Sequence, residues 1–134
     1  MNEIGRSNAA LAALAPRVKR AWYVLATSSE VTTQPIVRAL YGVPIVVFRG
    51  EDGRAGAVLD RCPHRNVPLS GGRVVGAELE CPYHGWRFGR DGRCTTIPGL
   101  DGTAAHPARR APAWPVVEQQ GFVWAWGDAD SEPE

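Results

Sequence analysis

Two short segments, each with one cysteine and one histidine, constrain this chain more than any other feature. They read CPHR at 62–65 and CPYHGW at 81–86. Both lie in Pro- or Gly-containing stretches between predicted strands, and loops of this kind can turn side chains toward a shared centre. The sequence therefore predicts a site where two thiolates and two imidazoles converge. The candidate ligands are Cys62, His64, Cys81 and His84.

The distribution of these ligands limits the choice of metal. The three cysteines of the chain cannot all pair with each other, so a metal-binding or reactive role is favoured over a disulfide scaffold. A structural zinc accepts a Cys2His2 set, but zinc fingers usually place like ligands in the same loop. Here each loop is mixed, which fits a binuclear 2Fe-2S cluster with both cysteines on one iron and both histidines on the other. Zinc remains the alternative.

The rest of the sequence predicts an all-β domain. A length of 134 residues allows one domain, and 15 glycines with 11 prolines favour short elements joined by turns. We expect an antiparallel sandwich or small barrel, with a cluster-binding subdomain made of the two ligand loops. A short helix is expected from Ser7 or Asn8 to about Ala15. The predicted strands are 22–27, 36–40, 44–49, 55–60, 73–75, 78–81, 86–88, 94–96, 116–118 and 122–126.

Charge and hydropathy exclude several classes of function. The net charge is only +1, and no Lys/Arg-rich run is interleaved with aromatic residues, so a nucleic acid partner is not predicted. No stretch approaches the ~18 apolar residues of a membrane span, and the N-terminus lacks the pattern of a signal peptide. We therefore expect no membrane association and a cytoplasmic protein. Residues 127–134 carry four acidic residues and are expected to form a solvated tail.

The residues around the candidate ligands resemble a known family. The segments LDRCPHRNVPLSGG and ELECPYHGWRFGRDG, the RGEDG turn and the IPG triplet are similar to the cluster-binding domain of Rieske non-heme iron ring-hydroxylating and O-demethylating oxygenases. The resemblance runs from about Trp22 to Trp126. It implies a Rieske fold over 21–126, preceded by an extension at 1–20 and followed by the acidic tail at 127–134. It also implies that the two cysteines bind one iron and the two histidines the other.

Residues beside the ligands carry further expectations. Gly85 is expected to allow close backbone approach. Trp86 is expected either to cover the cluster or to pack as an ordinary aromatic residue. Arg65 and Arg87 are either solvated, or at least one of them helps to dock an acidic partner. Respiratory-chain Rieske proteins resemble the pattern but carry an extra cysteine in each loop and two hydroxyl side chains near the cluster. The absence of those hydroxyl donors implies a low reduction potential. The corresponding positions here are Val67 and Tyr83 for the cysteines, and Trp86 and Phe88 for the hydroxyl residues.

The remaining cysteine and histidine are expected to be spare. Cys94 is predicted to be a small buried hydrophobe, and His106 a solvated loop residue. The family's catalytic iron needs two histidines and a carboxylate, and only His106 is left after the cluster is assigned. The 134 residues therefore lack a catalytic iron site.

Three functions are compatible with this pattern. The first is a stand-alone ferredoxin-like carrier that takes one electron from a flavin-containing reductase and passes it to an oxygenase or other acceptor. The second is the electron-transfer domain or subunit of an oxygenase whose catalytic iron lies on another chain. The third is a zinc-stabilised binding module without redox activity. We favour the first, because the chain has a Met1 start and stops where the resemblance ends.

Overall fold

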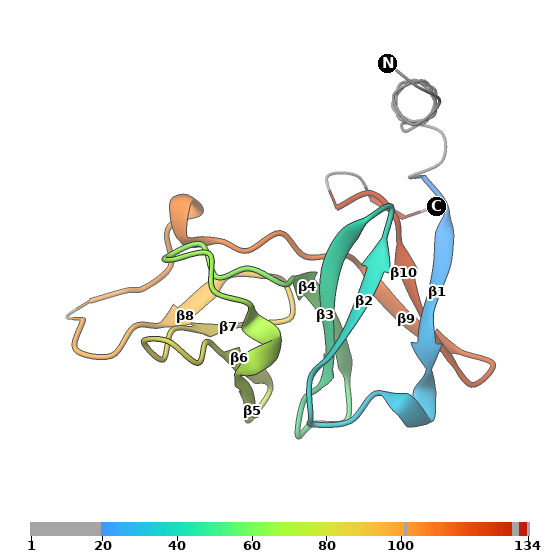
Figure 1. The fold of residues 1–134 in the computed structure, drawn as a ribbon, viewed down its shortest axis with the longest axis horizontal. Coiled ribbons are helices and arrows are strands. Elements are labelled where there is room, and N and C mark those ends of the chain that lie inside the picture. Colours follow the sequence, from blue (N-terminus) through green and yellow to red (C-terminus); the bar gives the residue numbers. More distant parts are fainter. Residues whose placement is uncertain (1–19, 101, 130–131, 134) are drawn as a thin grey trace, which may run out of the picture.

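The computed structural model describes residues 20–100, 102–129 and 132–133, and these form strands and single-turn 3-10 helices (Figure 1). The helix expected over 7–15 lies outside the described residues. The strands are β1 (Trp22–Thr27), β2 (Ile36–Leu40), β3 (Val43–Arg49), β4 (Ala55–Leu59), β5 (Arg73–Val75), β6 (Glu78–Glu80), β7 (Arg87–Phe88), β8 (Cys94–Thr96), β9 (Val116–Gln119) and β10 (Phe122–Trp126). The 3-10 helices are η1 (Ser28–Glu30), η2 (Leu69–Gly71) and η3 (Pro107–Arg109).

The strands form three antiparallel sheets, which we call A, B and C. Sheet A has the order β1-β10-β9, sheet B the order β2-β3-β4 and sheet C the order β5-β6-β7-β8. The sheets are open in the described part of the chain, and sheet C lies to one side of sheets A and B (Figure 1). The prediction of an antiparallel all-β fold is confirmed.

Most predicted strands agree with the structure to within one residue, and the differences beside the ligand loops have a physical reason. Strands predicted at 78–81 and 86–88 are observed as Glu78–Glu80 and Arg87–Phe88. The backbone N–H of Cys81 donates to the carbonyl of Trp86 at 2.7 Å. Both residues therefore close the loop between the strands instead of extending the sheet.

Strand β3 connects two hydrophobic cores because both of its faces are buried. Ile45 and Val47 point into a core shared by sheets A and B, whereas Val46 and Phe48 point into a core that includes the candidate cysteine ligands. All four side chains are fully buried. Alternation along a strand sends successive side chains to opposite faces, so β3 holds the ligand-bearing part firmly against the rest of the domain.

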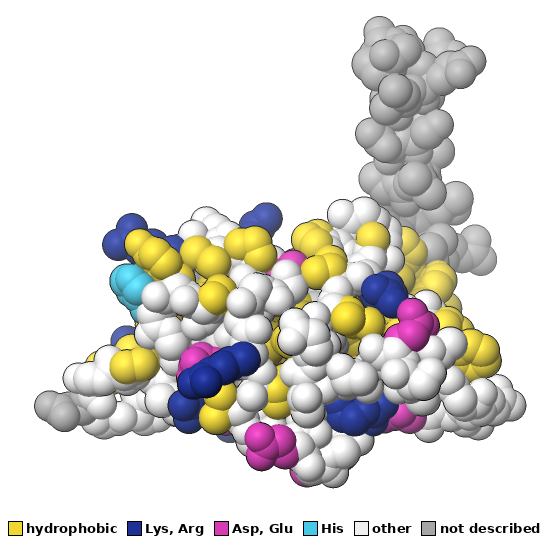
Figure 2. Space-filling view, turned by 60° about the horizontal axis from the view of Figure 1, so that its bottom comes forward, with side chains coloured by type: hydrophobic (Ala, Val, Ile, Leu, Met, Phe, Trp, Pro, Cys, Tyr) yellow, Lys and Arg dark blue, Asp and Glu magenta, His cyan; other side chains and the backbone are white. Residues whose placement is uncertain are grey.

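Ion pairs between turns add to this connection. Asp52, in the turn after β3, accepts two hydrogen bonds of 2.9 and 2.7 Å from the guanidinium of Arg90, in the turn after β7. Arg49 at the end of β3 makes a similar two-bond pair with Glu118 of β9, at 2.6 and 3.0 Å. Basic and acidic side chains accordingly lie side by side on the surface (Figure 2).

Candidate metal centre

The two ligand loops have the same backbone construction. In the first, the N–H of Cys62 donates to the carbonyl of Val67 at 2.8 Å and the N–H of Asn66 to the carbonyl of Cys62 at 2.7 Å. In the second, the N–H of Cys81 donates to Trp86 at 2.7 Å and that of Gly85 to Cys81 at 3.2 Å.

The fifth residue of each loop takes the left-handed conformation. Its φ is 58° at Asn66 and 75° at Gly85. Asn and Gly are the residues that adopt this conformation most readily. At Gly85 a side chain would also press on the ring of Pro98, since a Cβ would lie 3.2 Å from its Cγ. Both the positive φ and the neighbouring Pro98 ring therefore favour glycine at position 85.

The two candidate cysteine ligands are buried next to each other. Cys62 and Cys81 are 1% and 3% exposed. Burial raises the pKa of Cys62 to about 11, the adjacent Cys81 thiol adds to this rise, and hydrogen bonds from the backbone N–H groups of His64 and Arg65 oppose it. Without a metal the Cys62 thiol favours the protonated form at neutral pH, so binding a metal there would release a proton.

The two candidate histidine ligands lie beside each other and closer to solvent. The ring centroids of His64 and His84 are 5.2 Å apart, with His64 half-buried and His84 exposed. Desolvation lowers the pKa of His64, and the neighbouring His84 and Arg65 lower it further. A lowered pKa favours the neutral imidazole, which is the form that binds a metal.

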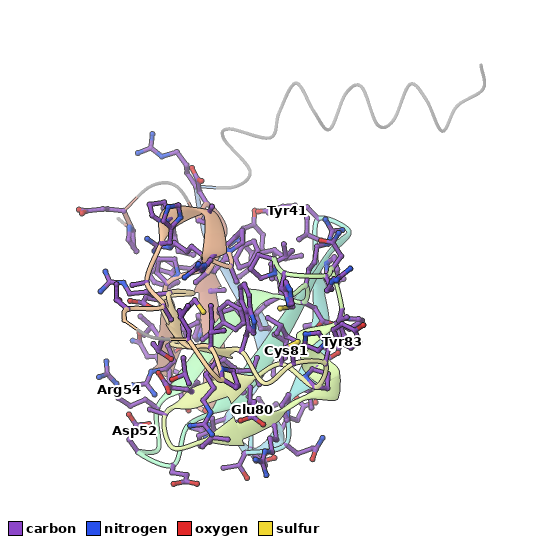
Figure 3. All side chains as sticks on the ribbon, turned by 90° about the vertical axis from the view of Figure 1, so that its left-hand side faces the viewer. Tyr41, Asp52, Arg54, Glu80, Cys81 and Tyr83 are labelled. Carbon is purple, nitrogen blue, oxygen red and sulfur yellow. The ribbon has the colours of Figure 1, made fainter. Side chains whose placement is uncertain are left out.

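Each imidazole is stacked on an aromatic ring. The indole of Trp86, from the second loop, lies parallel to His64 of the first loop, with centroids 4.4 Å apart and an interplanar angle of 4°. Tyr83 stacks on His84 at 4.0 Å and 12°. Tyr83 is 55% exposed and lies beside Cys81 (Figure 3). The sequence left Trp86 either over the cluster or in ordinary packing, and it predicted neither the stack of Trp86 on His64 nor that of Tyr83 on His84.

Charged residues lie next to the candidate ligands in both loops. Glu80, directly before Cys81, accepts hydrogen bonds from Arg73 at 3.1 Å and from Arg87 at 2.9 Å. These bonds lower the pKa of Glu80, with that from Arg87 contributing most. Arg87 is therefore held in an ion pair, whereas Arg65 is exposed beside His64.

The spare cysteine and histidine lie where the sequence predicted. Cys94 is fully buried in β8, and burial raises the pKa of its thiol. His106 is exposed and precedes η3, where its Nδ1 accepts a hydrogen bond of 3.1 Å from the backbone N–H of Ala108. Both residues are thus occupied in local structure.

The donor set suits a cluster that needs two sulfur and two nitrogen ligands. The structure brings the thiols of Cys62 and Cys81 together in a dry interior, and the imidazoles of His64 and His84 together nearer the surface. In the described part of the chain, no three His, Cys, Asp or Glu side chains are grouped to hold one ion. The thiols form one pair and the imidazoles another. Rieske-type ligation uses such pairs.

Residues 21–107 match the family model described as "Rieske [2Fe-2S] domain". The match covers more than half of the chain, and the chain belongs to this family. Its cofactor is a Rieske-type 2Fe-2S cluster.

Curated relatives are oxygenase components. The chain is 41% identical over 109 residues to the oxygenase component of chloroacetanilide N-alkylformylase of Rhizorhabdus wittichii, covering 81% of this chain and 31% of that protein. It is 41% identical over 110 residues to the oxygenase component of dicamba O-demethylase of Stenotrophomonas maltophilia, covering 81% and 32%. The chain thus spans about a third of the length of these relatives.

Solved structures show the same fold. The structure of dicamba monooxygenase bound to dicamba superimposes with a TM-score of 0.78 at 37% identity, over 87% of this chain and 37% of that one. The NdmA protein of Pseudomonas putida CBB5 superimposes with a TM-score of 0.75 at 28% identity, over 84% and 36%. The Rieske fold is therefore observed.

Among the described residues, no helix has both the length and the apolar composition needed to cross a membrane.

Proposed function

We propose that this chain delivers single electrons to the catalytic iron of a Rieske oxygenase, with residues 21–126 as the electron-transfer domain. The observation that carries the proposal is the arrangement of Cys62 and Cys81 in the interior with His64 and His84 toward the surface. When bound, the 2Fe-2S cluster supplies a one-electron carrier. The two thiols would hold the inner iron and the two imidazoles the outer one.

In this proposal the protein supplies an exposed ligand ring and a docking surface for its redox partners. The imidazole of His84 is exposed, so a partner can approach within contact of a candidate ligand. The guanidinium of Arg65 lies on the same surface and would attract an acidic donor or acceptor, such as a flavin-containing reductase. Tyr83 and Trp86 hold the two rings in place by stacking, which limits the rearrangement that accompanies each transfer.

An oxygenase is the proposed acceptor, and the similarity to curated oxygenase components supports this choice. The 134 residues provide one further histidine, His106, and it caps η3. Two histidines and a carboxylate for a catalytic iron must therefore come from other residues than these. The alternative is a self-contained carrier that serves a separate oxygenase, and location in the cytoplasm is expected for both.

Spectroscopy of the purified protein tests the cluster and its ligands. We expect visible absorption, a Rieske-type EPR signal after reduction, and two irons with two acid-labile sulfides per chain. Cys62→Ser or His84→Ala should abolish the signal. The matched controls are Cys94→Ser and His106→Ala, which should retain it. A colourless protein with one zinc and no labile sulfide would refute the proposal.

The size of the native protein distinguishes a domain of an oxygenase from a self-contained electron carrier. An antibody against this domain would detect the protein in cells that express the natural gene. A band about three times the size of these 134 residues supports an oxygenase component of the relatives' length. A band at the size of the 134 residues supports a separate carrier or subunit, and copurification with an oxygenase would then identify the acceptor.

A further inference from the structure

A carboxylate at the start of the first ligand loop is tied to the end of that loop. Asp60, two residues before Cys62, accepts a hydrogen bond of 2.6 Å from the backbone N–H of Ser70 and one of 2.8 Å from the Ser70 hydroxyl. Each carboxylate oxygen accepts one of these bonds, and both residues are half-buried. Hydrogen bonds to an ionised carboxylate are stronger than those between neutral groups. The two bonds therefore form a firm bridge across the loop that carries Cys62 and His64.

Both ends of this bridge are fixed to the rest of the domain. The backbone N–H of Asp60 donates to the carbonyl of Pro44 in β3 at 3.0 Å. Ser70 is the middle residue of η2, and its neighbour Leu69 is fully buried in the core that also holds the two candidate cysteine ligands. The bridge between Asp60 and Ser70 therefore determines where η2 lies relative to β3.

The end of η2 also contacts the second ligand loop on both sides of Cys81. At Gly72, directly after η2, an added Cβ would overlap the carbonyl oxygen of Glu80. At Gly71, the last residue of η2, an added Cβ would lie 3.6 Å from the Cγ of Pro82. Glu80 and Pro82 are the neighbours of Cys81 in the chain. The backbone after Ser70 therefore packs directly against the segment that positions the second thiol, as closely as only glycine permits.

These contacts form a continuous route from Cys62 to Cys81. The route runs from Asp60 through Ser70 and the end of η2 to the neighbours of Cys81. Two thiolates on one iron must lie at the separation that their bonds to the metal impose. A residue that fixes the segments carrying them can therefore affect the cluster without touching it.

We infer that Asp60 is a positioning residue that, through Ser70, sets the spacing of the Cys62 and Cys81 thiols for the cluster. The inference rests on the assignment of these two cysteines as ligands in the proposed function. It concerns the geometry of the Asp60 carboxylate, whose two oxygens receive the two donors of Ser70. Loss of the bridge would let η2 and the second loop shift relative to the first.

Replacing Asp60 separates its geometry from its charge. Asp60→Ala removes both hydrogen bonds, and the cluster should be lost to an iron chelator at least roughly tenfold faster than from the wild type. Asp60→Asn keeps an oxygen that can accept from the Ser70 N–H and an amide that can donate to the hydroxyl oxygen. This variant should stay close to the wild type. Ser70→Ala removes one bond and should give an intermediate rate, which absorption spectroscopy measures.

A double variant tests whether the two residues act as one bridge. Because Asp60→Ala already removes both bonds, adding Ser70→Ala should not increase the rate of cluster loss further. The EPR spectrum of the reduced cluster provides a second readout, because its g-values respond to the geometry of the ligands. These g-values should change in Asp60→Ala and stay as in the wild type in Asp60→Asn.

Asp52→Ala is the matched control for loss of a bridging carboxylate. Asp52 also accepts two hydrogen bonds from one partner, Arg90, but it lies apart from Cys81 (Figure 3). Its replacement should lower the midpoint of urea denaturation and leave the rate of cluster loss and the EPR spectrum unchanged.

Three results would overturn the inference while leaving the cluster in place. The first is a rate of cluster loss in Asp60→Ala no faster than in Asp52→Ala. The second is equally rapid loss in Asp60→Ala and Asp60→Asn, which would assign the effect to charge. If Asp60→Ala does not fold, Ser70→Ala decides, and a rate equal to that of the wild type is the third. A colourless wild-type protein would instead refute the ligand assignment, and the inference with it.

Discussion

The indole of Trp86 lies parallel to the imidazole of His64, at a centroid distance of 4.4 Å, and it reaches that ring from the other ligand loop. The stack therefore joins the two loops through side chains, whereas each loop is closed separately by its own backbone hydrogen bonds. Among the described residues, no backbone hydrogen bond joins one ligand loop to the other. Trp86 consequently has a larger structural role than a cover over the centre.

Replacing Trp86 tests this role. Trp86→Leu removes the flat ring from a half-buried position and should lower the free energy of unfolding by about 1–2 kcal/mol. The cluster should also be lost faster to an iron chelator, which absorption spectroscopy follows. Trp86→Phe keeps a ring that can stack and should behave closer to the wild type. Equal rates of cluster loss in all three proteins would contradict this account.

The reduction potential should lie at the low end of the Rieske range. Hydrogen bonds to cluster sulfurs stabilise the more negative reduced state and raise the potential. The positions that carry hydroxyl donors in the respiratory-chain proteins are Trp86 and Phe88 here, and Phe88 is fully buried without a polar group. We expect a midpoint nearer about −150 mV than about +300 mV. Redox titration followed by EPR measures it, and a value above about +100 mV would disprove the argument.

Two similar glycine turns should tolerate alanine very differently. Gly53 and Gly92 have φ values of 84° and 82°. A Cβ at Gly53 would meet nothing within 4 Å, whereas one at Gly92 would overlap the carbonyl oxygen of Ala111. Gly53→Ala should therefore cost about 1 kcal/mol of stability through backbone strain alone. Gly92→Ala should cost about 3 kcal/mol or more. Urea denaturation compares them, and equal midpoints would refute the prediction.

Stability should depend on pH through Glu118. Its hydrogen bonds with Arg49 lower the pKa of this carboxyl. A group with a lowered folded-state pKa contributes stability above its unfolded pKa, about 4.3, and loses that contribution as pH falls through the folded pKa. Glu118→Gln should therefore lower the free energy of unfolding by about 1 kcal/mol at neutral pH.

The pH profile of the Glu118 variant distinguishes the ion pair from general packing. Its difference from the wild type should shrink as pH falls below about 4 in urea titrations. Glu51→Gln, at an exposed position in the turn after β3, is the control for removing one surface carboxylate and should match the wild type at neutral pH. A constant deficit of the Glu118 variant across the pH range would mean that charge is not the cause.

Local sequence signals predicted the strands well. Asp-Gly turns separate β3 from β4 and β7 from β8, because residues in such turns limit where a strand can continue. The pairing of β1 with β10 could not be predicted in this way. Trp22 lies opposite Trp126, and contacts between residues this far apart in sequence leave no local pattern.

The ligand loops likewise combine features that the local sequence predicts with contacts that it does not predict. The residue types at 62, 64, 81 and 84 predicted the donor set. The shared loop geometry could also have been found, because Asn66 and Gly85 occupy the same position when CPHRNV is aligned with CPYHGW. The stacking of Tyr83 on His84 and of Trp86 on His64 depends on how the loops pack together, so the sequence alone did not predict it.

The bond from Gly127 to Ala21 means that the described domain begins and ends at one corner, beside sheet A and across the molecule from sheet C (Figure 1). Any chain that leaves the domain at residue 20 or residue 129 therefore starts from the side opposite the imidazole pair. An addition at either of these points starts away from the proposed electron-exchange surface.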